Sequence, residues 1–154
     1  MFEAALSDGL RFKCMECSEC CTGSPGYVWL SDADIAVLCS HFGGIKVEEF
    51  ATSYCIYVEV DEGQALSLKE KIRYDCIFLE NGRCSVYRAR PTQCRTYPFW
   101  EEILRSAENW RSESRYCPGI GKGDFVSSEK IADAVVLERS NPRQIFARPE
   151  KPQE

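Results

Sequence analysis

The chain has 154 residues, of which 44% are hydrophobic and 28% are charged, as in one ordinary globular domain. Its formal net charge of −5 argues against nonspecific binding to DNA or RNA, which needs a basic surface. The N-terminus lacks the basic segment and apolar run of a secretory signal, and no stretch has the ~18 apolar residues that span a bilayer. We therefore expect a cytoplasmic protein with reduced thiols and with no nucleic-acid or membrane partner.

The predicted elements of the first half are short. Residues 1–12 should form a short amphipathic segment, with its apolar side chains at Phe2, Leu6, Leu10 and Phe12. Ser31 and Asp34 have the spacing of a capping box, and apolar residues then recur at helical spacing until Gly43-Gly44 ends the helix. A second short helix is expected from Val47 to Tyr54.

Two β-hairpins are predicted in the middle of the chain. The first joins residues 56–60 to residues 65–69. The second joins residues 76–79 to residues 84–87 across Asn81-Gly82, the preferred pair for a type I′ turn. This second hairpin should bring the two cysteines at its open end within reach of each other.

The last predicted elements are helices. Pro91 suits the first turn of a short helix that carries Cys94, and a final helix is expected over residues 128–139 with Ile131, Val135 and Leu137 on its apolar face. We predict a small, loop-rich α+β fold in which one domain covers residues 1–147 and residues 148–154 form a disordered tail. Its core is modest, so bound metal should contribute to folding.

Cysteine is the most unusual feature of the composition, with ten residues in the chain. Four of them fall within eight positions as C-x-x-C-x-x-C-C, namely Cys14, Cys17, Cys20 and Cys21. Dense thiols form disulfides, bind zinc or hold iron–sulfur clusters, and a reducing compartment disfavours disulfides. C-x2-C-x2-C resembles the bacterial ferredoxin run, whereas zinc ribbons use two separate C-x-x-C pairs. The spacing favours an iron–sulfur cluster, [4Fe–4S] first, with zinc as the alternative.

Eight thiolates would fill two four-thiolate centres. The candidate ligands are Cys14, Cys17, Cys20, Cys21, Cys76, Cys84, Cys94 and Cys117. Adjacent cysteines cannot easily bind one small ion because the chelate ring is strained, so Cys21 either faces a second centre or is a structural thiol. Cys117 is likewise either a ligand or a buried structural thiol. Cys39 lies on a helical apolar stripe and Cys55 ends an apolar turn, so we expect both in the core.

Three ordered blocks of this sequence resemble the CxxCxxCC family, the YkgJ-like cysteine-cluster proteins described as zinc- or iron-chelating. The blocks are residues 14–21, residues 76–99 and Cys117-Pro118-Gly119, and the resemblance covers about residues 12–121. It implies metal binding by the eight cysteines but no particular reaction. Relatives in the family, the flagellin lysine methylases, are described as carrying an iron–sulfur centre with similar cysteines, which supports iron.

Arginines and aromatic residues near the cysteines are the next candidates for a role at the metal site. Arg88, Arg90 and Arg95 either offset the negative charge of a thiolate centre or pair with acidic side chains. The aromatic stretch 97–100 is expected to form a hydrophobic lid, and Trp110 and Tyr116 to pack similarly. His41, the single histidine, is expected as a helix C-terminal cation rather than as a ligand.

Together these features predict a metal-binding protein with an iron–sulfur cluster that serves electron transfer or the handling of metal or sulfide. The alternative is a structural zinc module that mediates protein–protein interaction. A third reading is an enzyme that uses an open cluster position as a Lewis acid. Metal ions are the predicted partners, and the sequence specifies neither a reaction nor a protein or redox partner.

Overall fold

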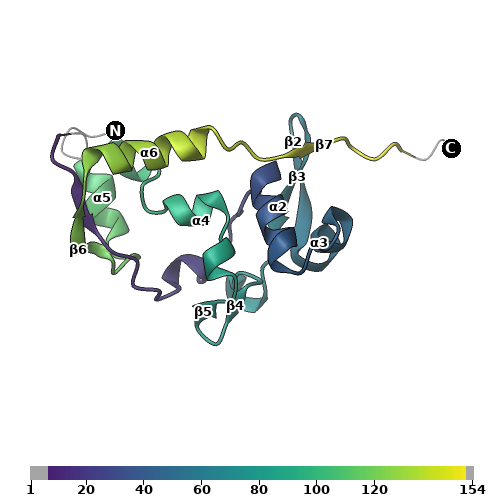
Figure 1. Cartoon of the computed structure of the whole chain (residues 1–154), viewed down its shortest axis with the longest axis horizontal. Helices are drawn as coiled ribbons and strands as arrows, with labels where there is room; N and C mark the ends of the chain where they lie inside the picture. Colours follow the sequence, from purple (N-terminus) through teal and green to yellow (C-terminus); the bar gives the residue numbers. More distant parts are fainter. Residues whose placement is uncertain (1–6, 152–154) are drawn as a thin grey trace.

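The computed structural model describes residues 7–151, and it shows the predicted α+β class (Figure 1). Its elements are short and are joined by long loops. The helices are α2 (Asp32–His41), α3 (Val47–Tyr54), α4 (Thr92–Thr96), α5 (Ala107–Glu113) and α6 (Ser128–Arg139). The strands are β1 (Leu10–Phe12), β2 (Cys55–Val60), β3 (Gly63–Leu68), β4 (Leu79–Glu80), β5 (Arg83–Cys84), β6 (Ile120–Val126) and β7 (Ile145–Phe146).

The first hydrophobic core lies where α2 and α3 pack beside an antiparallel sheet with the order β2-β3-β7. The predicted capping box begins α2, since Ser31 Oγ accepts from the Asp34 backbone N–H and Asp34 Oδ2 accepts from that of Ser31. The helix ends at His41, and Gly43 and Gly44 directly after its C-cap Phe42 have φ values of 82° and 81°. Four of the largest fully buried side chains of the protein belong to this core, Leu30, Leu38, Phe50 and Leu66.

A second hydrophobic core lies at the other end of the molecule, where β1 pairs antiparallel with β6 beside α5 and α6 (Figure 1). The rings of Phe99 and Trp110 stack at 5.9 Å, and Phe12 meets Phe99 edge-on at 5.4 Å. Its buried members are Phe99, Ile103, Leu104, Trp110, Ile131 and Val135. The protein therefore divides its apolar residues between two small cores, with α4 and the β4–β5 hairpin between them.

Several sequence predictions are corrected by these elements. Residues 10–12 are a strand, while Phe2 and Leu6 of the expected amphipathic segment lie outside the described residues. The second hairpin is shorter than predicted, because residues 87–89 turn into a 3-10 helix directly after β5. Leu137 is 43% exposed, since it lies two positions after buried Val135 and therefore on the opposite face of α6.

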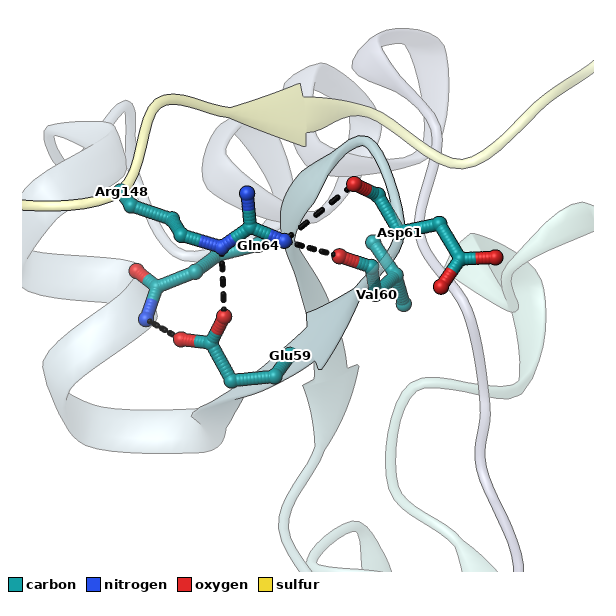
Figure 2. Close-up of polar contacts among 5 residues, drawn as sticks. All are labelled: Glu59, Val60, Asp61, Gln64 and Arg148. Atoms are coloured by element: carbon teal, nitrogen blue, oxygen red, sulfur yellow. Dashed lines mark hydrogen bonds and ion pairs between the residues drawn. The ribbon is translucent and has the colours of Figure 1, made fainter.

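Arg148, where we expected the tail to begin, contacts the turn of the β2–β3 hairpin (Figure 2). Its Nε donates to Glu59 Oε2 at 2.9 Å, and its Nη2 donates to the carbonyl oxygens of Val60 and Asp61. Gln64 Nε2 donates to the other oxygen of the same carboxylate. The described chain is thus anchored to this hairpin at residue 148, and residues 152–154 lie outside the described part.

The two faces of α6 give a test of this packing. Ile131→Ala removes a fully buried side chain from the second core, and we expect a loss of about 2 to 5 kcal/mol in the free energy of unfolding. Leu137→Ala on the exposed face is the control and should change it by less than about 0.5 kcal/mol. Urea denaturation followed by circular dichroism measures both, and equal losses would contradict the assignment of the faces.

Candidate metal centre

Seven of the eight candidate ligands line one cavity of about 370 Å³ between the two cores. They are Cys14, Cys17, Cys20, Cys21, Cys84, Cys94 and Cys117. The eighth, Cys76, lies beside them, since its backbone N–H donates to the carbonyl oxygen of Cys21 at 2.7 Å. All ten cysteines of the chain are free thiols in this structure.

The cysteine run itself is held in place by backbone contacts at both of its ends. Lys13 N–H donates to Gly119 O at 3.1 Å, which places Cys14 beside the loop that carries Cys117. Glu16 and Ser18 have positive φ values of 50° and 65°, and a 3-10 helix then covers Glu19–Cys21. Ser18 Oγ donates to the carbonyl oxygen of Gly82 in the β4–β5 turn. The run therefore crosses from the second core to the hairpin that presents Cys84.

Burial is the largest effect on the pKa of two thiols of the cavity. It raises the pKa of Cys94, and the nearby Cys76 and Cys20 raise it further. It also raises the pKa of Cys117, and the charge of Cys17 adds to this effect. A metal that binds these thiols would displace their protons.

Cys20 and Cys21 have their sulfur atoms 3.9 Å apart. The hydrogen bond between the two thiols is the largest effect on both: it lowers the pKa of Cys20 to about 7 and, together with burial, raises the pKa of Cys21. The two sulfurs can thus share one proton while one of them is a thiolate. A thiolate is the form that binds metal, so this pair supplies one ready ligand.

Within residues 7–151, no three His, Cys, Asp or Glu side chains converge closely enough to hold a single metal ion. The thiols instead surround the cavity from several sides. His41 is exposed at the end of α2 and is not part of the cavity wall. The donor set is composed of soft thiol sulfur, which suits zinc or iron–sulfur clusters rather than magnesium or calcium.

Three arginines line the same cavity, Arg83, Arg90 and Arg95, together with Glu16 and Glu19. Arg90 lies 3.8 Å from the centre of the Tyr87 ring and donates from Nε to the Tyr87 carbonyl oxygen. Burial raises the pKa of Cys84, and the charge of Arg90 opposes this rise. Arg88, which we had grouped with these residues, is exposed and does not line the cavity. Sequence reasoning missed Arg83, whose position after the Asn-Gly turn was its one signal.

The predicted aromatic lid is only partly present. Tyr97 lines the cavity, with its hydroxyl donating to Glu113 Oε1 at 2.6 Å, but Phe99 is buried in the second core. Trp110 is buried as expected. The prediction that Tyr116 packs in the same way is wrong, because this ring is 70% exposed at the cavity wall.

A family model described as "CxxCxxCC: Putative zinc- or iron-chelating domain" matches residues 13–118, which hold all eight candidate ligands. The chain belongs to the CxxCxxCC family. A curated relative, the uncharacterised protein MJ0939 of Methanocaldococcus jannaschii, is 24% identical over 137 residues. That alignment covers 84% of this chain and 44% of the relative, so the chain spans less than half of the relative's length. No solved structure matches the chain.

The family description supports metal binding by this CxxCxxCC domain. Cys39 and Cys55 lie in the first core and not at the cavity, which confirms their prediction as core thiols. Burial raises the pKa of Cys55 to about 12 and also raises that of Cys39, so both remain protonated at neutral pH. Among the part of the chain that the structure describes, none of the helices has the length and apolarity to cross a bilayer.

Alanine substitutions separate ligands from core thiols in this CxxCxxCC domain. Cys39→Ala and Cys55→Ala should keep the full metal content and lose packing energy on the order of 1 kcal/mol. Cys76→Ala and Cys94→Ala should lose metal, because Cys94 lines the cavity and Cys76 lies beside its thiols. Metal per chain, measured by mass spectrometry on anaerobically purified protein, gives the comparison. Metal loss in the Cys39 or Cys55 variant would contradict the assignment.

Proposed function

We propose that this chain is a cytoplasmic iron–sulfur domain that holds its cluster through the cysteines of the cavity. The observation that carries the proposal is the gathering of seven predicted ligands at one cavity from four separate regions of the chain. These regions are the run 14–21, the β4–β5 hairpin, α4 and the loop at Cys117. Free thiols at such density agree with a reducing compartment.

The spacing of the thiols favours a cluster over a single ion. A tetrahedral zinc site needs four donors that converge on one point, whereas a cubane distributes its thiolates over four irons. Seven candidate ligands line one cavity, and three of them, Cys14, Cys17 and Cys20, have the C-x2-C-x2-C spacing of the bacterial ferredoxin run. A cluster bound there would supply redox chemistry, and the chain's own thiols would hold it in place.

The charges around the cavity suit such a group. Thiolate-held centres carry net negative charge, and nearby cations and hydrogen-bond donors stabilise them and tune their potential. Arg83, Arg90 and Arg95 line the cavity together with two acids, Glu16 and Glu19, so three positive side chains face two negative ones at its wall. The chain as a whole is acidic, with a net charge of −5, so this small excess of cations differs in sign from the protein as a whole.

Exposure of the N-terminal thiols favours a role in electron transfer or metal handling. Cys14, Cys17 and Cys20 are exposed, whereas Cys117 is buried. A cluster held at this edge would lie close to solvent, where a redox partner or a metal donor could reach it. A closed structural zinc site for protein–protein interaction remains the competing proposal, and the family description includes zinc.

The identity of the metal can be decided on anaerobically purified protein. We expect a brown protein with iron and acid-labile sulfide, and with absorption at about 400 nm that bleaches with dithionite. Metal and sulfide analysis accompany the spectra. A colourless protein with stoichiometric zinc and no sulfide, even after anaerobic reconstitution, would establish the zinc module instead.

Removal of the metal should uncouple the two ends of the fold. The candidate ligands tie the β1–β6 end to the first core, so a chelated sample should lose its single cooperative transition or melt at a sharply lower temperature. Differential scanning calorimetry of holo and stripped protein measures this. Melting temperatures within a few degrees of each other would show that the centre is accessory to folding.

A further inference from the structure

A second cavity, of about 250 Å³, adjoins the thiol cavity and shares part of its wall. Cys20, Cys21 and Cys94 line both cavities, and so does Tyr97. A molecule bound in the second cavity would therefore lie directly beside the candidate ligands. The predicted metal centre does not use this second cavity.

The walls of the second cavity are rich in aromatic rings, those of Tyr27, Tyr74, Tyr97 and Trp100. The Tyr97 and Trp100 rings meet edge-on, with centroids 5.1 Å apart. Their polar ends are engaged by the protein, because the Tyr97 hydroxyl donates to Glu113 and Trp100 Nε1 donates to Gln93 O. The surface that these two residues offer to the cavity is the carbon surface of the rings.

A carboxylate lies at the wall of this cavity. Glu70 lines it, and Gly26 N–H holds the carboxylate by donating to Oε1 at 2.9 Å. Lys69 also lines it, but its ammonium donates to the carbonyl oxygens of Thr52 and Ser53, which do not line the cavity, so this cation is directed toward the end of α3. Arg83, Arg90 and Arg95 line the thiol cavity and not this one.

We propose that this aromatic cavity binds a small organic cation of the quaternary ammonium class. Ring faces attract such cations through their quadrupoles, and a carboxylate at the wall adds direct attraction. The inference rests on the proposed function in one respect, since an anionic thiolate centre at Cys20, Cys21 and Cys94 would strengthen the attraction.

A pair of probes of equal shape tests the charge preference. Choline carries the trimethylammonium group, and 3,3-dimethyl-1-butanol is its neutral isostere. Titration of holo protein followed by proton NMR should show saturable binding of choline, with its N-methyl resonance shifted upfield by the rings. The neutral alcohol should bind at least about fivefold more weakly, because it lacks the cation–π attraction. Equal affinity for the two probes would overturn the proposal.

Two variants locate the site. Glu70→Gln keeps an acceptor for Gly26 N–H but removes the charge, and Tyr74→Leu removes a ring that is 50% exposed. Each should weaken choline binding by about fivefold. Tyr57→Leu is the matched control, since this ring is 52% exposed and lies outside the cavity. Unchanged binding in both Glu70→Gln and Tyr74→Leu would place the cation elsewhere and reject the site.

Metal and sulfide content measured on the same samples separates the two proposals. Metal-replete protein that fails to bind choline rejects the cation site alone. Purified protein that contains no metal rejects the iron–sulfur proposal. If that protein still binds choline, and Glu70→Gln still weakens the binding, the cation site is supported without a metal centre.

Discussion

The position of the cysteine run between two small cores is the constraint on which the structure depends. One end of the run is fixed to the second core by the bond from Lys13 to Gly119, and the other to the segment before β4 by the bond from Cys76 to Cys21. A small core supplies little surplus stability, so a cross-link at such a junction has a large effect on the whole chain. The thiols are located where a bound group would hold both cores at once.

A buried carboxylate, Asp34, fixes α4 relative to the first core. Its Oδ1 accepts from both the backbone N–H and the hydroxyl of Thr92, at 2.9 and 2.8 Å, and its Oδ2 accepts from Asn141. Thr92 Oγ1 in turn accepts from Arg95 Nη2. A buried charge is stable only with such donors, so the carboxylate specifies one position for the helix that carries Cys94. Asp34, the acidic member of the capping box of α2, thereby also contributes through Thr92 to the position of Arg95 at the thiol cavity.

Local signals in the sequence predicted the local structure correctly. They did not predict the pairing of strands that lie far apart in the sequence. The capping box at Ser31 and the Asn81-Gly82 turn depend on neighbouring residues, and both are present as predicted. The pairing of β1 with β6 joins Leu10 to Val126, and β6 has no strand periodicity because Gly121 and Gly123 interrupt it. That pairing brings the Cys117 loop to Cys14. The candidate ligands could be named from spacing and resemblance, but the cavity that gathers seven of them could not be predicted, since tertiary contacts form it.

The two cavities that share Cys20, Cys21 and Cys94 have different walls, and this difference bears on what would surround a bound centre. The wall of the thiol cavity holds three arginines and two glutamates, whereas that of the second cavity holds aromatic rings with one glutamate and one lysine. The arginines can offset the charge of a thiolate centre. On the other side the same three thiols adjoin a mostly aromatic wall, so a molecule bound there would lie next to the centre.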